Sequence, residues 1–304
     1  SAGSIVAAEL ARDPNVKVLV LERGPRTEEH PETLDADGYK DAFINDQVIW
    51  ERFSVPQANA GKQRIFMGSG TGMGGSGSVN GMVYTRGAAE DYDQWPDGWK
   101  WNDVTKDFEA IEKVLRPNRR SATEFTEACI RGSEAAGFRR KEDLNDGDLS
   151  GVLGYEWMTY EGDRRRSSYV SFVLDRGPLP NLTIRTGALV HRIDVDSDRR
   201  ATGVRYEHDG ELRLARAKRE VVMAAGALET PKLLLLSGIG PAEELRKHGI
   251  EVVADIAGVG RNLHDHPNTP LFFLGKKATD SNYPQLYGFH RANPKLALPQ
   301  KQSD

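Results

Sequence analysis

The hydrophobic and polar positions predict a helix followed by a strand at the start of the chain. Ala2 to Arg12 has helix-forming composition with an apolar stripe, and Asp13-Pro14 ends it. Val16 to Leu21 is a run of apolar and β-branched residues typical of a buried strand. A helix, a short turn and a buried strand form the second half of a βαβ unit.

The middle of the chain predicts two more helices after a polar, irregular stretch. Asn102 is expected to cap a helix over Asp103 to Val114. Ser121-Ala-Thr-Glu124 matches a capping box for a second helix that Gly137 would close. The tryptophans at the start of this region are expected to lie in the core: Trp95, Trp99 and Trp101.

The later part of the chain predicts strands and a second ligand-binding strand end. Short strands are expected at Leu182 to Arg185, Ala188 to Val195, Thr202 to Glu207 and Glu211 to Ala215, three of them in a partly exposed antiparallel layer. Glu220 to Ala225 has the pattern of a buried strand that runs into Gly226. A helix with Thr230 as N-cap and Pro231 at the first helical position is expected next.

Composition narrows the class of protein without selecting a partner. The 304 residues suffice for roughly two domains, and a net charge of −4 with 28% charged residues indicates neither a nucleic-acid surface nor a disordered acidic tail. The longest apolar run, Leu233 to Leu236, is too short to span a membrane. The single cysteine, Cys129, fits a cytoplasmic setting. Both ends of the chain are expected to be cut, because it opens without methionine or a first strand.

Glycine recurs between Gly68 and Arg86, which favours close approach of the backbone to a ligand. A flexible Gly/Ser linker is the alternative interpretation. Gly3 lies where the third glycine of a dinucleotide motif would be, and Glu22 lies where that motif has its ribose ligand, although an ordinary solvated strand end explains Glu22 equally well. Arg164 to Arg166 forms either an anion site or a basic loop before a serine N-cap.

Three separated segments resemble the glucose-methanol-choline (GMC) oxidoreductase family, whose members carry FAD. Met73-Gly-Gly-Ser-Gly-Ser-Val-Asn80 is similar to the first family signature, although Thr71 and Met73 depart from its usual residues. Gly226 to Gly240 matches the second signature throughout, and Gly260 to His266 is similar to a third family loop.

The resemblance implies an α/β fold, namely an FAD-binding Rossmann-like domain with an additional antiparallel β layer and the start of a substrate domain. The FAD domain would cover residues 1–268, with a helical and loop excursion at about 92–180, and the substrate domain would begin at 269–304. The implied cofactor-binding residues are Gly3, Glu22, Gly74, Gly75, Ser76, Asn80, Gly81, Met82, Val83, Val190, Ala225 and Gly226. Val79 stands where some members attach FAD through a histidine, so FAD would be non-covalent.

The resemblance also implies oxidation of a small alcohol by hydride transfer to flavin N5, with dioxygen or a quinone-like molecule as the electron acceptor. The late histidine that serves as base in the family has no match here, and Asp265 and His266 would fix a loop, so no catalytic residue and no metal ligand is assigned. Alternatives are a hydroxynitrile-lyase-type FAD protein and an inactive FAD-binding fragment. A nicotinamide enzyme would leave the match over Gly226 to Gly240 unexplained.

Overall fold

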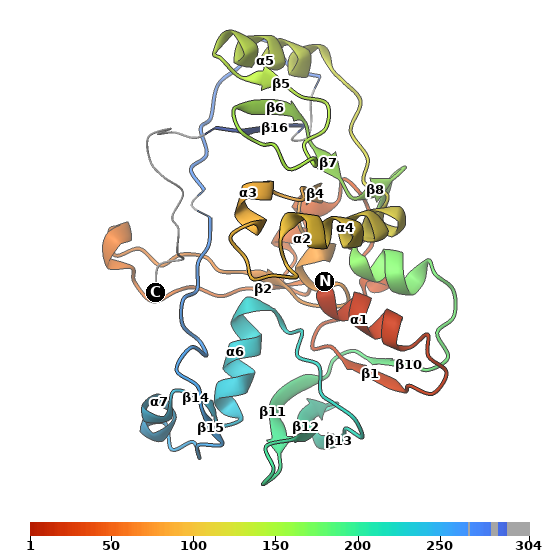
Figure 1. Ribbon diagram of the computed structural model, residues 1–304, viewed down its shortest axis with the longest axis vertical. Coiled ribbons are helices and arrows are strands. Elements are labelled where there is room, and N and C mark those ends of the chain that lie inside the picture. The colour runs from red at the N-terminus through yellow and green to blue at the C-terminus, as the bar shows by residue number, and fades with distance from the viewer. Residues whose placement is uncertain (267, 281–284, 291–304) are drawn as a thin grey trace. The chain divides into compact units, whose positions relative to one another are not determined.

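The computed structural model describes residues 1–266, 268–280 and 285–290 of the chain (Figure 1). It contains two compact units: unit 1 comprises Ser1–Asn80 and Ser167–His266, and unit 2 comprises Gly81–Arg166 and Pro267–Asp304. The predicted division into functional domains at residues 268 and 269 stays a prediction, because a division by contacts does not test it. No helix among the described residues combines the length and the apolar character needed to cross a bilayer.

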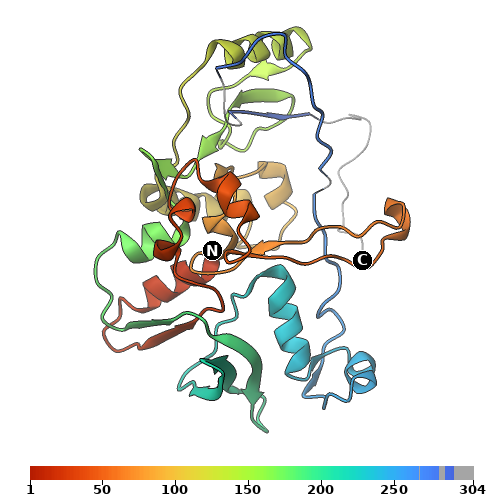
Figure 2. The same cartoon turned by 180° about the vertical axis from the view of Figure 1, so that it is seen from behind.

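Unit 1 begins with the predicted helix and strand. Its first part contains α1 (Ala2–Leu10), β1 (Val18–Leu21), the 3-10 helices at Thr27–Glu29, Pro31–Thr33, Ala58–Ala60 and Gly75–Ser78, α2 (Tyr39–Ile44), β2 (Ile49–Trp50) and β3 (Ser69–Gly70). β2 and β3 pair in antiparallel fashion. Figure 2 shows the long two-stranded loop between them in orange, where Phe53 and Phe66 form an antiparallel bridge.

The second part of unit 1 supplies the partner of β1. It contains a π-helix at Val170–Leu174, β10 (Leu182–Arg185), β11 (Leu189–Val195), β12 (Ala201–His208), β13 (Glu211–Arg216), α6 (Gly226–Leu236), β14 (Ile239–Gly240), α7 (Ala242–Lys247) and β15 (Ala254–Asp255). β1 pairs with β10 in parallel, as a βαβ-type arrangement requires. β11, β12 and β13 form the predicted antiparallel layer.

Two predictions about the region before α6 are wrong. Within the described part of the chain, Glu220 to Ala225 is not a strand, and Val222 is 50% exposed. A strand needs a backbone partner, and no described segment forms a ladder with this run. Thr230 is not the N-cap of α6, because the helix already begins at Gly226 and contains Pro231 in its interior.

Unit 2 is built around a small sheet of three strands. Its elements are β4 (Val83–Tyr84), α3 (Ala89–Tyr92), α4 (Trp101–Leu115), α5 (Glu124–Ala135), β5 (Arg139–Arg140), β6 (Val152–Tyr155), β7 (Trp157–Met158), β8 (Tyr160–Glu161), β9 (Arg164–Arg165) and β16 (Leu286–Phe289). β6 lies between β16 and β5. β4 lies near the end of the glycine-rich segment of residues 68–86, called the glycine stretch below, and pairs with β7.

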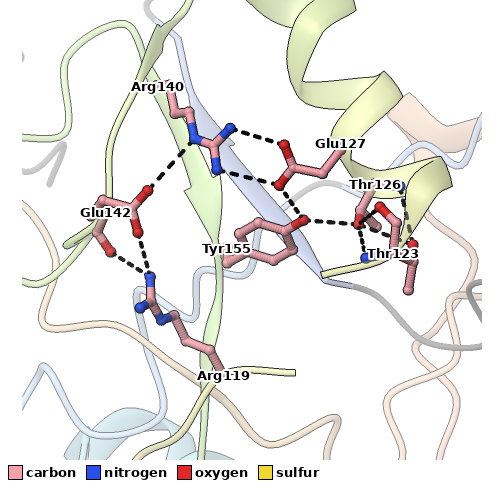
Figure 3. Close-up of polar contacts among 7 residues, drawn as sticks. All are labelled: Arg119, Thr123, Thr126, Glu127, Arg140, Glu142 and Tyr155. Carbon is pink, nitrogen blue, oxygen red and sulfur yellow. Dashed lines mark hydrogen bonds and ion pairs between the residues drawn. The ribbon is translucent and has the colours of Figure 1, made fainter. Parts of the chain in front are cut away.

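A polar network connects α5 with the sheet of unit 2 (Figure 3). The Tyr155 hydroxyl donates a hydrogen bond to Glu127 Oε1 over 2.8 Å and lies 3.0 Å from Thr126 Oγ1. Arg140 of β5 donates to the other carboxylate oxygen of Glu127 over 3.0 Å and forms an ion pair with Glu142 over 3.6 Å. The tyrosine is 8% exposed, so these contacts satisfy a hydroxyl that would otherwise be buried without a partner.

Both helices that the sequence predicted in this region exist, but their N-termini differ from the prediction. α4 begins at Trp101 with Lys100 as N-cap, and α5 begins at Glu124 with Thr123 as N-cap and Thr126 as the reciprocal partner. The predicted caps Asn102 and Ser121 are therefore wrong by a few residues.

The expected burial of two tryptophans is also wrong. Trp95 is 47% exposed and Trp99 is 59% exposed, because both lie in the turn before α4 rather than on its packed face.

Candidate functional site

Glu22 lies at the carboxyl end of β1, which is the edge where ligands bind in α/β sheets. Its Oε1 accepts hydrogen bonds from the backbone N–H of Gly24 (2.9 Å) and of Gly72 (3.0 Å). Its backbone carbonyl accepts from Ala188 N–H over 2.9 Å. One carboxylate therefore connects the end of β1 to the glycine stretch.

The two carboxylate oxygens of Glu22 differ in their hydrogen bonding. Among the described residues, Oε2 accepts no hydrogen bond, whereas Oε1 accepts two. Burial raises the pKa of Glu22, and the N–H groups of Gly24 and Gly72 oppose that rise because they favour the charged form. An acceptor with one free oxygen at a strand end can bind a pair of neighbouring hydroxyl groups.

Gly24 makes this arrangement possible, and the sequence prediction did not include it. A Cβ on Gly24 would overlap the backbone nitrogen of Gly72 and would lie 2.6 Å from the carbonyl carbon of Thr71. Only glycine allows the two backbones to approach so closely. The signal in the sequence is a glycine two residues after the strand-end glutamate.

The glycine stretch is packed and ordered, so the flexible-linker interpretation is wrong. Met73 is 3% exposed and Ser78 is 3% exposed, and the Ser78 hydroxyl donates to the Met73 carbonyl over 2.9 Å. Gly74 has a φ of 90°, and a Cβ there would overlap the Ser78 hydroxyl and lie 3.2 Å from Tyr169 Cβ. The loop therefore has a defined shape that could hold a ligand.

The N-terminal end of α1 contacts this loop. Ser1 Oγ donates to the Gly74 carbonyl over 3.2 Å and accepts from Gly77 N–H over 3.1 Å. Gly3 lies in the first turn of α1, and a Cβ there would be 3.1 Å from Ala224 Cβ. The structure thus brings a helix N-terminus to predicted cofactor-binding glycines, an arrangement that favours an anion such as pyrophosphate.

Ser76, Val79 and Asn80 complete the part of the loop that belongs to unit 1. Ser76 Oγ accepts from Gly70 N–H over 3.0 Å, and the Ser76 carbonyl accepts from Asn80 N–H over 3.0 Å. Val79 is 7% exposed and belongs to an apolar cluster with Val48 and Ile49. The position that could carry a covalent link therefore holds a buried aliphatic side chain.

The predicted residues Gly81, Met82 and Val83 belong to unit 2. Met82 has a φ of 63° and a side chain that is 1% exposed, and its carbonyl accepts from Thr159 N–H over 3.0 Å. Val83 pairs with Met158 and is 41% exposed. Tight pairing with β7 gives these residues a fixed backbone.

Glu112 of α4 binds two side chains that follow Val83 in the chain. Glu112 accepts hydrogen bonds from the Tyr84 hydroxyl over 2.8 Å and from Arg86 Nε over 2.6 Å and Nη2 over 2.5 Å. Burial, followed by the hydrogen bond to Glu112, raises the pKa of Tyr84 well above its usual value. No pattern in the sequence distinguishes Glu112, because it is one of several acidic residues on a predicted helix.

The remaining predicted residues lie near other strand ends of unit 1. Val190 is in β11, two residues after Ala188, which contacts Glu22. Ala225 precedes α6, and its N–H donates to the Thr230 hydroxyl over 3.1 Å. Gly226 has a φ of 86°, a left-handed conformation that suits glycine. Their contacts with a cofactor stay predictions.

Two other candidates from the sequence have simple structural explanations. Ser167 Oγ accepts from Val170 N–H over 3.3 Å, so the serine after the three arginines contributes to the start of a helix, as predicted. The basic loop expected before it is wrong, because Arg164–Arg165 form β9 and Arg165 is 0% exposed. Asp265 and His266 are exposed, and Asp265 Oδ1 accepts from His266 N–H over 2.8 Å. In the part of the chain that the structure describes, no group of three or more metal-ligating side chains gathers.

Comparison with known proteins places this arrangement in a family. A sequence profile described as GMC oxidoreductase matches residues 2–268. An uncharacterized GMC-type oxidoreductase of Mycobacterium bovis is 32% identical over 98% of this chain and 64% of its own length. An oxygen-dependent choline dehydrogenase of Burkholderia thailandensis is 34% identical over 98% of this chain and 56% of its own length.

Solved structures show the same fold. A formate oxidase of Aspergillus oryzae, from a study of FAD modification, is 29% identical with a TM-score of 0.77 over 87% of this chain and 50% of that chain. Pyridoxine 4-oxidase from Mesorbium loti, at 24% identity, has a TM-score of 0.78 over 84% of this chain and 54% of that chain.

The chain therefore spans between about half and two thirds of the length of these relatives. The family profile and the solved structures confirm the predicted mixed α/β FAD-binding fold. The chain belongs to the GMC oxidoreductase family, whose members bind FAD.

Proposed function

We propose that this chain is the FAD-binding part of an enzyme that oxidises an alcohol to a carbonyl compound, with FAD held non-covalently. The observation that carries the proposal is Glu22, which offers one free carboxylate oxygen at the end of β1 while its other oxygen fixes Gly24 and Gly72. This geometry suits the two adjacent hydroxyls of an adenosine ribose.

The glycine stretch would hold the rest of the cofactor through its backbone. Ser1 connects the N-terminus of α1 to Gly74 and Gly77, so that N–H groups and the helix dipole favour the pyrophosphate. The backbone of Asn80 to Val83, fixed through Thr159 and Met158, would position the flavin ring. FAD would supply the redox chemistry by accepting a hydride at N5.

The surroundings of Val79 support the proposal of non-covalent binding. Its side chain is 7% exposed, packs against Val48 and Ile49, and has no nucleophilic atom. FAD should therefore be released when the protein unfolds in acid or denaturant. A yellow chromophore that remains with the precipitated polypeptide would contradict this part of the proposal.

The base that removes the substrate proton is proposed to lie outside this chain, and no residue here is given that role. The acceptor that reoxidises the cofactor would be dioxygen or a quinone-like molecule. The substrate is proposed to be a small alcohol, a class that includes the substrate named by the choline dehydrogenase relative.

The deciding experiment mixes the intact protein with a panel of primary and secondary alcohols in the absence of oxygen. Loss of the oxidised flavin absorption bands with at least one alcohol is the expected result. If no alcohol reduces the flavin, and a cyanohydrin instead releases its aldehyde without consuming an acceptor, the protein is a lyase. A preparation that stays colourless with added FAD contradicts cofactor binding itself.

A further inference from the structure

Two tryptophans of unit 2 stand side by side on the surface without a covering segment among the described residues. Trp95 is 47% exposed and Trp99 is 59% exposed, and their ring centroids are 6.5 Å apart. On the inner side, Trp95 packs against Tyr92 at 5.3 Å, and Tyr92 packs against Phe108 of α4 at 6.0 Å. The exposed indoles are thus anchored to a helix rather than carried on a loose loop.

The turn that carries Trp99 is held in one conformation. Asp103, in the first turn of α4, accepts hydrogen bonds from Gly98 N–H over 3.0 Å and from Lys100 N–H over 3.1 Å. Trp99 N–H donates to the Pro96 carbonyl over 3.0 Å. A surface fixed in this way loses little conformational entropy when it binds a partner.

The charges around the indoles are mostly negative. Residues 89–100 contain four acidic side chains and one basic one. The basic one, Lys100, forms an ion pair with Asp97 over 2.8 Å, and Asp97 raises the pKa of Lys100, with smaller contributions from Asp103 and Asp93. Asp97 is therefore already paired within the protein, whereas no ion pair is formed by Asp91 or Asp93 among the described residues.

We propose that the surface formed by Trp95, Trp99 and the carboxylates of Asp91 and Asp93, close to them in the chain, is a docking site for an arginine-rich segment of a partner protein. A guanidinium group can stack on an indole face while it pairs with a carboxylate, which a lysine or an apolar side chain does less well. Charge complementarity selects a basic partner over an acidic one or a purely apolar one. The proposal uses none of the residues proposed to bind FAD, so it does not depend on the enzymatic proposal.

The test uses the full-length protein with FAD and a dye-labelled hexa-arginine peptide, followed by fluorescence anisotropy at low and at high salt. We expect saturable binding that weakens by on the order of tenfold when salt shields the charges. Trp99→Ala and Trp95→Ala should each weaken binding about fivefold, since each removes a stacking face. Hexa-lysine should bind more weakly, and hexa-glutamate should not bind.

Matched variants separate this site from general attraction to an acidic protein. Phe273→Ala removes an aromatic ring that is 88% exposed elsewhere in the chain, and Asp198→Asn removes an exposed carboxylate in the turn between β11 and β12. Neither should change peptide affinity, whereas Asp91→Asn should lower it. Circular dichroism checks that every variant folds.

Three results would overturn the proposal. These are absence of peptide binding, equal binding by the tryptophan and control variants, and protection of Trp95 and Trp99 from a soluble quencher in the full-length protein. The last result would mean that other parts of the same protein cover this surface. Because the readout is binding and not turnover, an alcohol that fails to reduce the flavin would leave the result unaffected.

Discussion

Glu156 gives the sharpest quantitative prediction, because it is a buried carboxyl group with an unsatisfied oxygen. It lies between β6 and β7 with 4% exposure, and its Oε1 has no hydrogen-bond partner among the described residues. Burial raises its pKa to about 7, and the charge of Arg120 opposes that rise without cancelling it. The folded protein therefore holds this group protonated at pH values where an exposed glutamate is ionised.

The sign and size of the effect follow from linkage between protonation and folding. Below about pH 4.5 the carboxyl is neutral in both the folded and the unfolded state, so it costs nothing. Between about pH 4.5 and 7 the unfolded state ionises while the folded state does not, and stability falls. One pKa unit corresponds to about 1.4 kcal/mol, so the loss should approach about 3 kcal/mol above pH 7.

The measurement is hydrogen exchange of peptides that cover β6 and β7, expressed as protection factors from pH 5 to pH 8. In the wild type, protection should fall on the order of 100-fold over this range, since local opening lets Glu156 ionise. Glu156→Gln keeps the shape and cannot ionise, so its protection should stay level and exceed that of the wild type at pH 8. The control is Glu109→Gln on the exposed side of α4, which should follow the wild type.

Two outcomes of the exchange measurement would contradict the raised pKa of Glu156. If the wild type and Glu156→Gln lose protection in parallel as pH rises, the carboxyl does not titrate with local opening. If Glu156→Gln is instead much less protected at every pH, the ionised form makes a favourable contact that the described residues do not show.

Other predictions concern the contacts that shape the two units. Glu112→Gln removes the negative charge that binds Arg86, whose side chain is 14% exposed, and Tyr84. The free energy of unfolding, measured by urea titration, should fall by about 2 kcal/mol, and the control Glu109→Gln should leave it unchanged. Tyr155→Phe deletes the hydroxyl between Thr126 and Glu127 and should cost about 1 kcal/mol, whereas an unchanged midpoint would show that water replaces it. Gly70→Ala should destabilise the protein by about 1 to 3 kcal/mol even without FAD, because its Cβ would lie 2.6 Å from the Gly75 carbonyl carbon. Gly81→Ala meets no atom within 4 Å and should leave the apoprotein unchanged, so weaker FAD binding by this variant in a fluorescence titration would identify a ligand contact.

Much of the fold could be predicted because its elements have strong local patterns. The apolar run that becomes β1 and the alternating runs that become β11, β12 and β13 determine strands almost by themselves. Glu220 to Ala225 has an equally strong pattern but forms no strand, because sheet formation depends on a partner that local sequence does not reveal. The caps of α4 and α5 were missed by a few residues for a similar reason, since competing polar residues lie within one turn.

The site was less predictable than the fold. A glutamate after a strand indicates a nucleotide site only when other groups hold its carboxylate in place. In this chain the backbone N–H groups of Gly24 and Gly72 do so, and these two glycines are 48 positions apart. The residues next to Glu112 and Glu156 in the sequence form no motif that sets them apart from other glutamates. Their hydrogen bonds and burial arise only when distant segments pack, so no local pattern could distinguish them.

The glycines at the candidate site, in the glycine stretch and at position 24, are of two kinds. At Gly24, Gly70 and Gly74 an added Cβ would collide with the protein's own atoms, so glycine there is required to build the loop. At Gly81 no described atom lies within 4 Å of an added Cβ, so packing among the described residues does not require glycine there. Because the first group already accounts for most of the close contacts, a glycine-rich sequence by itself overstates how much backbone faces a cofactor. Substitutions at Gly81 and Glu22 therefore test cofactor contact most directly. An added Cβ at Gly81 meets no described atom, and only one carboxylate oxygen of Glu22 accepts hydrogen bonds from the described residues.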